Sequence, residues 1–463
     1  MIWERYHPER HATPLHGLAW GFNIYNHAIV TNLSTKCVLF CQLELTNMVT
    51  ERKKIYRKAL QFLLYLISAF LLLSSAASLH IPKQHFNGWK RIIINQDYQT
   101  PLVLDEGDDN TLIVDAVFHD FTGDAITLGN VSNVYIKNCV IYDIDGNGIV
   151  FRSTRKTDRV TIDSCVIHDT TKNGIIAKQN IEEGVDHTQL VIKNNKLYNN
   201  GTTELDHGLY IQAQDTKIEN NEITNSAGNG ISIRSSGIVS GNTIRDTQKS
   251  CIRYFSDNVR GPSNTLLIEN NICTLSLPGS ESPAFSLLLS DDAHPDWIVG
   301  KYIIRFNTIA VFTGQRAGIA VESDELKSKN IMVYGNIVIN TEDPHSTINE
   351  QNIDYYSSNY VSTEFQGFKD VQHPPYDFHL KPWSPAIDYA NHEAKFPTYD
   401  ADGQPRTPGH LDAGAYQLTR NTSIFLMQNV SYLLEILLLV GISLLGVRII
   451  KNARKRTPPD ITT

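Results

Sequence analysis

The segment ELDHGLYIQ, residues 204–212, carries the side chains of this chain that are best suited to proton transfer. It places Asp206, His207 and Tyr210 close together, and these residue types serve as general acids and bases. Basic side chains fall at related positions of a repeating pattern described below; they are Arg152, Lys178, Arg234 and Arg253. Acid–base groups beside several cations suit a substrate that carries carboxylates.

Polymers of uronic acids are substrates of this kind. In β-elimination a cation neutralises the C6 carboxylate, a base removes the C5 proton, and an acid assists the departure of O4. A C5 epimerase forms the same carbanion and reprotonates it from the other face. We therefore predict an acidic polysaccharide as partner, with a lyase or C5-epimerase activity. The predicted catalytic residues are His207, Tyr210, Lys178, Arg234 and Asp206, and the predicted substrate-binding residues are Arg152, Gln212 and Arg253.

Two other functions compete with this one. Glycoside hydrolysis needs a pair of carboxylates, and of Asp124, Asp206 and Glu322 only Asp206 lies beside the predicted cluster, so hydrolysis is less favoured. A histidine before a corner glycine is also a common turn residue. The alternative hypothesis is therefore a non-catalytic protein that binds glycans or serves adhesion or envelope structure.

A repeated frame, I-x-x-N-x-I, positions these residues. It recurs with asparagine or cysteine in the fourth place at Cys139, Cys165, Asn195, Asn221, Asn242, Asn271, Asn307 and Asn336, at intervals of 21 to 36 residues. Such a period indicates a repeat architecture. If each repeat is one coil of parallel strands, the aliphatic residues point inward and the asparagines stack at about 4.8 Å, each amide bonding to the next. Stacking would satisfy polar groups that are costly to bury alone.

A second frame, G-I-x-I, lies between successive asparagine positions. Its copies occupy residues 124–129, 147–152, 173–178, 207–212, 229–234, 250–255 and 317–322. Equivalent outward positions should stack into columns along a solenoid. One predicted column contains Thr127, Val150, Ile176, Tyr210, Ser232, Arg253 and Ala320. The next contains Arg152, Lys178, Gln212, Arg234, Phe255 and Glu322.

Over residues 90–345 these repeats resemble the right-handed parallel β-helix repeats of the pectin-lyase-like superfamily. Segments 377–388, 400–406 and 411–417 resemble the module that closes many bacterial surface β-helix proteins ahead of varied C-terminal anchors. The resemblance implies an all-β, right-handed, single-stranded parallel β-helix over residues 79–345 and a closing module over 346–420. It also implies an exported protein attached to the cell envelope.

Both ends of the chain contain apolar segments. Residues 48–78 have the basic start, apolar centre and small-residue end of a signal peptide, cleaved near Ala77, or of an uncleaved signal anchor. Residues 1–47 are predicted to be a non-native or disordered extension, with Met48 as the true initiator. After a linker at 421–431, residues 432–450 are long enough for a transmembrane helix and precede a basic cytoplasmic tail at 451–463. The β-helix should then lie outside the cytoplasm. A buried soluble helix is the weaker alternative for 432–450.

Composition adds further limits. With 49 acidic and 41 basic residues among 463, the net charge of -8 argues against nucleic-acid binding, and we expect a monomer. The cysteines at repeat positions, Cys139, Cys165, Cys251 and Cys273, are interpreted as packing residues, with a Cys139–Cys165 bridge as the alternative. We predict no metal site or cofactor. The acidic segment DEGDDN, residues 105–110, leaves Ca²⁺ as one candidate, although a solvated acidic loop is commoner.

Overall fold

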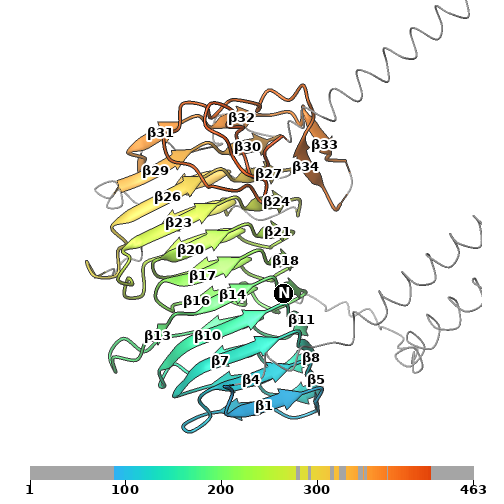
Figure 1. The fold of residues 1–463 in the computed structure, drawn as a ribbon, viewed down its shortest axis with the longest axis vertical. Helices are drawn as coiled ribbons and strands as arrows, with labels where there is room; N and C mark the ends of the chain where they lie inside the picture. Colours follow the sequence, from blue (N-terminus) through green and yellow to red (C-terminus); the bar gives the residue numbers. More distant parts are fainter. Residues whose placement is uncertain are drawn as a thin grey trace, which may run out of the picture. The chain divides into compact units, whose positions relative to one another are not determined.

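The computed structural model describes residues 88–277, 282–289, 294–312, 317–322, 330–341, 348, 352–372 and 374–418. Secondary structure in these residues consists of 34 strands, most of them three to five residues long. The chain visits three parallel sheets in turn, so that each circuit forms one coil, and successive coils stack on one another (Figure 1). This is a parallel β-helix, as the sequence predicted.

Each sheet takes one strand from almost every coil. Sheet A contains β1 (Arg91–Ile94), β4 (Thr111–Val114), β7 (Val131–Lys137), β10 (Thr157–Asp163), β13 (His187–Thr188), β14 (Val191–Lys193), β17 (Thr216–Glu219), β20 (Gly237–Ser240), β23 (Thr265–Glu269), β26 (Lys301–Arg305), β29 (Asn330–Tyr334) and β31 (Tyr355–Ser357). Sheet B contains β2 (Asp97–Tyr98), β5 (Val117–Thr122), β8 (Val140–Asp145), β11 (Val166–Thr170), β15 (Lys196–Tyr198), β18 (Glu222–Thr224), β21 (Thr243–Arg245), β24 (Ile272–Leu275), β27 (Thr308–Val311), β30 (Ile337–Asn340) and β32 (Tyr360–Ser362). Sheet C contains β3 (Leu102–Leu104), β6 (Ile126–Leu128), β9 (Ile149–Phe151), β12 (Ile175–Ala177), β16 (Leu209–Ile211), β19 (Ile231–Ile233), β22 (Ile252–Phe255), β25 (Phe285–Leu288) and β28 (Ile319–Val321).

The core of the coils is built by the alternation of side chains along each short strand. In β16, Leu209 and Ile211 are fully buried while Tyr210 points outward. The same inward positions hold aliphatic or aromatic side chains in the neighbouring coils, and together they form one continuous apolar core. Every outward position therefore has an equivalent in the coils on either side.

The corner between sheets A and B carries the predicted asparagine ladder, which we call the first ladder. Asn221 Oδ1 accepts hydrogen bonds from the backbone N–H and the Nδ2 of Asn195, both at 2.9 Å. Its own Nδ2 donates to Asn242 Oδ1 and to the Ile192 carbonyl, also at 2.9 Å. The prediction is confirmed, and the ladder continues one coil further, to Asn359.

The corner before sheet C carries a second ladder that the sequence did not predict. In it a side-chain acceptor of one coil receives the backbone N–H of the following coil. Its side-chain acceptors are Asp124, Asn147, Asn173, His207 and Asn229, and Ser250 ends the ladder by donating its backbone N–H to Asn229. Both ladders therefore satisfy backbone groups at buried corners, where an unpaired group would be costly.

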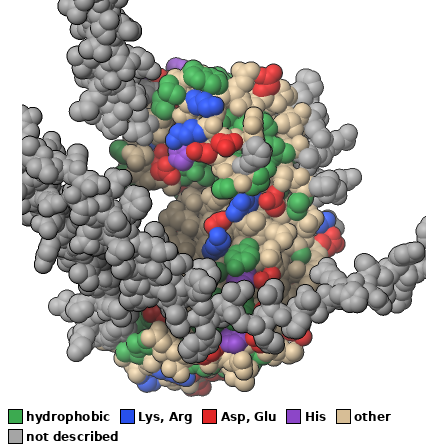
Figure 2. All heavy atoms as spheres, turned by 90° about the vertical axis from the view of Figure 1, so that its right-hand side faces the viewer, with side chains coloured by type: hydrophobic (Ala, Val, Ile, Leu, Met, Phe, Trp, Pro, Cys, Tyr) green, Lys and Arg blue, Asp and Glu red, His purple; other side chains and the backbone are tan. Residues whose placement is uncertain are grey.

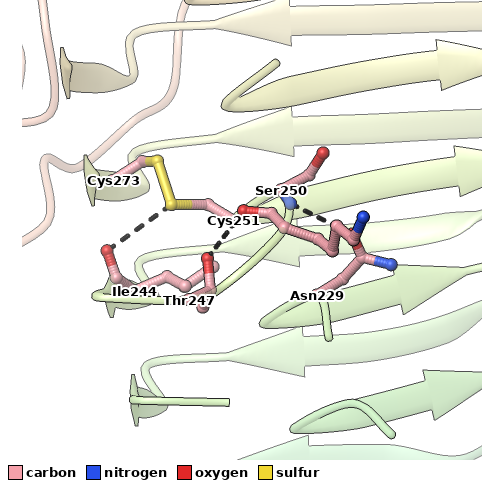
Figure 3. The surroundings of a disulfide bond; sticks show 7 residues. Asn229, Ile244, Thr247, Ser250, Cys251 and Cys273 are labelled. Carbon is pink, nitrogen blue, oxygen red and sulfur yellow. Dashed lines mark hydrogen bonds between the residues drawn. A yellow bond between two sulfur atoms is a disulfide. The ribbon is translucent and has the colours of Figure 1, made fainter. Parts of the chain in front are cut away.

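The corner residue that follows each member of the second ladder must be small. A Cβ on Gly230 would lie 2.5 Å from Ile244 of the next sheet B strand, and a Cβ on Gly208 would lie 2.8 Å from Ile223. In the next coil Cys251 takes the position of the glycine, and Cys273 takes that of the aliphatic residue, because Cys273 pairs with Ile244 in register. These two cysteines form a disulfide (Figure 3).

The interpretation of Cys251 and Cys273 as packing residues was therefore wrong. Two neighbouring coils bring their side chains into direct contact at a corner, where other coils pack glycine against isoleucine. Cys139 and Cys165 are buried and unbridged, as the sequence predicted.

A separate segment covers the last coils, with the antiparallel hairpin β33 (Phe368–Asp370) and β34 (Asp377–Leu380). Arg406 joins this segment to the coils of the β-helix. Its buried guanidinium donates to the Gly414 carbonyl at 2.7 Å and to Asn270 Oδ1 at 3.0 Å. The coils continue through β31 and β32, beyond residue 345.

Several predictions concern the ends of the chain. The extension at 1–47, the signal or anchor at 48–78, the linker at 421–431, the helix at 432–450 and the tail at 451–463 all lie outside the described residues. Within the described ranges, no helix has the length and apolar character needed to cross a membrane.

Candidate functional site

The outer face of sheet C presents the predicted columns. Ile176 pairs with Tyr210, Tyr210 with Ser232, and Ser232 with Arg253 in successive parallel strands. This is the register predicted from the G-I-x-I frame. Residues separated by more than twenty positions in the sequence therefore become neighbours on one face.

Tyr210, Arg234, Phe255 and Arg253 form a layered cluster on this face, which we call the cation–aromatic cluster. The guanidinium carbon of Arg234 lies 4.8 Å from the ring centre of Tyr210 and 4.9 Å from that of Phe255. The guanidinium of Arg253 lies 5.6 Å from the Phe255 ring. Each distance is within the range of a cation–π interaction. The cluster thus holds two cations and two rings in a fixed order.

Two carboxylates offset part of this positive charge. Arg234 Nη1 lies 3.0 Å from Asp257 Oδ2, and its Nε donates to Ser232 Oγ at 3.0 Å, so this side chain is firmly held and only 12% exposed. Burial lowers the pKa of Arg253, and the Glu322 carboxylate raises it in part. Glu322 itself accepts a hydrogen bond from Ser286 at 2.7 Å. Arg253 is therefore the less constrained cation of the two.

The remaining predicted binding residues differ in their surroundings. Arg152 forms an ion pair with Asp105 at 2.9 Å, so its charge is already matched. Lys178 is exposed, and its ammonium makes no ion pair with another described residue. Gln212 is buried, donates to the Tyr210 hydroxyl at 3.2 Å, and accepts the Gln179 N–H at 2.8 Å. Gln212 therefore fixes the position of Tyr210.

His207 is a member of the second ladder. Its Nδ1 accepts the Asn229 N–H at 3.0 Å, and its ring stacks on Tyr210 with 5.7 Å between the ring centres. Burial, reinforced by the charge of Arg234, lowers the pKa of His207 to about 3. The imidazole is therefore neutral near pH 7, with its acceptor nitrogen already engaged. In this geometry His207 orients Tyr210, and a catalytic role for it stays a prediction.

Asp206 closes a turn in the loop before β16. Its carboxylate accepts hydrogen bonds from the Thr203 N–H at 2.8 Å, the Thr203 hydroxyl at 2.7 Å and the Thr202 N–H at 3.2 Å. A carboxylate with three donors in its own loop is held there. The structure thus brings Tyr210, Arg234 and Arg253 together, whereas the Asp206 carboxylate is hydrogen-bonded within its own loop.

Sequence reasoning missed Asp257, the ion-pair partner of Arg234. It lies in the loop after β22, where the repeat pattern ends and the loops differ from coil to coil, so no spacing identified it. The same edge of sheet C borders a pocket of about 470 Å³ lined by Ile181, Arg260 and Trp297, among others. The loops that follow the sheet C strands therefore form a hollow that carries an indole and a guanidinium.

The carboxylates of segment 105–110, which the sequence offered as a Ca²⁺ candidate, interact with other side chains and backbone groups of the protein. Asp108 forms an ion pair with Arg91 at 2.6 Å, and Asp109 accepts the Ser132 N–H at 2.7 Å. With Asp105 paired to Arg152, three of its carboxylates have protein partners. Among the described residues there is no group of three or more histidine, cysteine or acidic side chains arranged to hold a metal.

Comparison with known proteins agrees with the fold. A family described as "Right handed beta helix region" matches residues 86–183 and 124–281. No curated protein matches the chain.

Several solved structures are similar to this chain. The pectate lyase Pel9A aligns at a TM-score of 0.47 and 11% identity, over 71% of this chain and 86% of that one. The A-module of the Azotobacter vinelandii mannuronan C-5 epimerase AlgE4 aligns at 0.29 and 14%, over 51% and 84%. PfbA, a surface adhesin of Streptococcus pneumoniae, aligns at 0.29 and 11%, over 55% and 80%.

Proposed function

We propose that this right-handed parallel β-helix binds an acidic polysaccharide along the outer face of sheet C. The observation that carries the proposal is the cation–aromatic cluster, in which Arg234 lies between the rings of Tyr210 and Phe255 and beside Arg253. Guanidinium groups recognise carboxylates through charge-assisted hydrogen bonds. Aromatic rings pack against the apolar faces of sugar rings. The cluster combines both kinds of contact.

The geometry of the coils suits a polymer. Successive coils rise by about 4.8 Å, which is close to the length of one sugar unit in an extended chain. Lys178, Tyr210, Arg234 and Arg253 come from four successive coils of this face. A polysaccharide that runs along the helix axis would therefore meet a cation or an aromatic ring at nearly every unit.

Chemistry on the bound glycan is the further step of this proposal. Burial raises the pKa of Tyr210, so its phenol stays protonated near pH 7. It is then suited to donate a proton to the departing O4 in an elimination. The base is the role with least support, because His207 Nδ1 already accepts the Asn229 N–H. Binding is therefore supported best, with lyase or C5-epimerase activity as its extension.

We also propose that the β-helix lies outside the cytoplasm, attached to the cell envelope by the apolar segment at 432–450. The Cys251–Cys273 disulfide supports an oxidising compartment, since such bonds persist mainly in exported proteins. Protease treatment of intact cells tests this proposal. Digestion of the β-helix in intact cells is expected, whereas protection until the cells are lysed would contradict it.

The binding proposal is tested by titrating the full chain with polygalacturonate, alginate and heparin at low and moderate salt. A Lys178→Gln/Arg253→Gln variant should bind the preferred polymer about tenfold or more weakly, because it removes two charge-assisted contacts. The wild-type affinity should fall with added salt.

Lys217→Gln is the matched control, since Lys217 is exposed on the outer face of sheet A. Equal loss of binding in both proteins would show a general charge effect and would contradict a site on sheet C. Ultraviolet absorbance of unsaturated uronates and NMR analysis of C5 configuration report any chemistry. A Tyr210→Phe variant that binds normally but forms no product would assign the proton donor.

A further inference from the structure

A second pocket lies on sheet B, where the closing segment meets the coils. One wall consists of outward side chains of β18, β21 and β24, and the other contains Tyr376, Phe378 and Tyr416. Its volume is about 400 Å³, within the range of small-ligand sites. Figure 2 looks onto this side of the molecule, where acidic, basic and hydrophobic side chains are interspersed. We propose that this pocket binds a neutral saccharide unit, independently of the acidic-glycan face on sheet C.

Hydrogen bonds between the closing segment and the coils, beside the pocket, hold its two walls in place in the absence of a ligand. Besides the bonds of Arg406 described above, the Thr308 hydroxyl accepts the Ala415 N–H at 2.9 Å. Asn270 Nδ2 donates to the Tyr399 carbonyl at 2.8 Å. These contacts join positions more than one hundred residues apart. The pocket is therefore preformed, which lowers the entropic cost of binding.

An unpaired hydroxyl group in the pocket points to a ligand. Thr274 lines the pocket and is 3% exposed, and its Oγ1 is buried without a hydrogen-bond partner in the structure. An unsatisfied buried polar group destabilises the ligand-free protein. Oγ1 is closed off in the ligand-free structure, and a turn of the Thr274 side chain about χ1 would bring it to the pocket, where a sugar hydroxyl would supply the missing partner.

The other polar groups of the pocket offer donors and acceptors in balance. Arg245 Nη2 donates to Glu222 Oε1 at 2.6 Å, and both side chains line the pocket. The pair is electrically neutral as a unit, yet each member retains capacity for further hydrogen bonds. With the rings of Tyr376 and Tyr416 opposite, the pocket presents an aromatic wall and a polar wall. A pyranose, with an apolar face and a rim of hydroxyls, matches this arrangement.

The surrounding charges disfavour an acidic ligand here. Burial raises the pKa of Tyr416, and the carboxylates of Asp402, Asp377 and Asp400 raise it further. His379, which stacks on Tyr416 with 3.9 Å between ring centres, lies between Asp377 and Asp402. Since Glu222 already neutralises Arg245, the local field is negative. A neutral sugar is therefore expected, in contrast to the glycan proposed for sheet C.

The experiment uses the full chain and neutral trisaccharides of glucose, mannose, xylose and N-acetylglucosamine as probes, with saturation-transfer NMR for detection and calorimetry for affinity. Thr274→Val keeps the shape of the side chain and removes its hydroxyl. We expect about tenfold weaker binding of the preferred trisaccharide. The thermal midpoint of the free variant should stay the same or rise, because an unsatisfied buried group is removed.

Thr224→Val is the matched control. Thr224 lies in the same outward column, two coils away in register, and its hydroxyl is likewise buried without a partner, but it does not line the pocket. This variant should bind the trisaccharide as the wild type does.

Three results would overturn the proposal. They are a lack of binding by all four trisaccharides at millimolar concentration, equal losses in the two threonine variants, and a loss of stability in Thr274→Val with unchanged binding. The Lys178→Gln/Arg253→Gln variant separates this site from the one on sheet C. If it abolishes trisaccharide binding, the sugar lies on sheet C and the second pocket is not its site.

Discussion

The two ladders of this protein perform one task with different tolerance for sequence change. In the first ladder each asparagine accepts through Oδ1 and donates through Nδ2 to a backbone carbonyl, as Asn221 does to Ile192. In the second ladder the side chain must accept one backbone N–H, and Asp124, Asn173 and His207 all do so. A position that must both donate and accept selects asparagine, as it does from Asn195 to Asn359, whereas Cys139 and Cys165 at the start of the ladder only donate, through Sγ, to a carbonyl of the preceding coil. A position that must only accept admits several residues, and one of them, His207, adjoins the candidate site.

The largest effect is expected from breaking the first ladder. Asn221→Ala removes an acceptor for two Asn195 donors and a donor to the Ile192 carbonyl, all in a buried corner. We expect the free energy of unfolding to fall by about 3 to 4 kcal/mol in denaturant titrations. A loss below about 1 kcal/mol would contradict the demand for both donor and acceptor.

The disulfide at the second corner is expected to contribute slightly less. Reduction of Cys251–Cys273, which are 22 residues apart, should lower the free energy of unfolding by about 2 to 3 kcal/mol. A Cys251→Gly/Cys273→Ile variant restores the glycine–isoleucine packing of Gly230 and Ile244. It should fold and lose its response to reductant. If it fails to fold, a glycine–isoleucine contact cannot replace the disulfide at this corner.

An intermediate loss of stability is expected at acidic pH, where His207 is protonated in the unfolded chain. Because burial lowers the pKa of His207 from 6.5 to about 3, the unfolded chain binds a proton between these values that the folded protein does not. Stability is therefore complete above about pH 6.5 and is lost as the pH falls. From pH 7 to pH 5 the loss attributable to His207 is about 2 kcal/mol.

His207→Asn restores the commoner ladder residue and should reduce this pH dependence by that amount, as measured by unfolding at both pH values. His187, whose pKa burial lowers to about 4, gives an acid-sensitive contribution that both proteins share. The exposed His392→Asn variant is the control and should keep the wild-type pH dependence. Equal slopes in all three proteins would show that His207 titrates normally.

The smallest effect is expected from breaking an asparagine–asparagine hydrogen bond that is exposed to solvent. Asn225 Nδ2 donates to Asn199 Oδ1 at 2.8 Å on the surface of the helix. Its φ of 54° suits glycine, so Asn225→Gly removes the hydrogen bond without backbone strain. The free energy of unfolding should change by no more than about 0.5 kcal/mol. A loss comparable with that of Asn221→Ala would mean that burial does not distinguish these asparagines.

The coil and its register were predictable because they depend on features that recur in every turn. The I-x-x-N-x-I and G-I-x-I frames place aliphatic residues inward, and one correct alignment of the two frames assigns Tyr210 and Arg253 to one column. The second ladder was harder to recognise, since Asp124, Asn173 and His207 share a hydrogen-bonding role but no residue type. The repeated frames indicated the scaffold and left that shared role unseen.

By itself, the sequence determined the parallel coils, the first ladder and the outward face that carries Tyr210, Arg234 and Arg253. The tertiary structure alone decided that Asp257 pairs with Arg234, that Cys251 bonds to Cys273, and that His207 is a buried acceptor. The physical reason is that coil formation follows local periodicity, which is written in every repeat. Charge pairing, disulfide formation and pKa depend instead on which side chains the unequal loops bring within a few ångströms of one another.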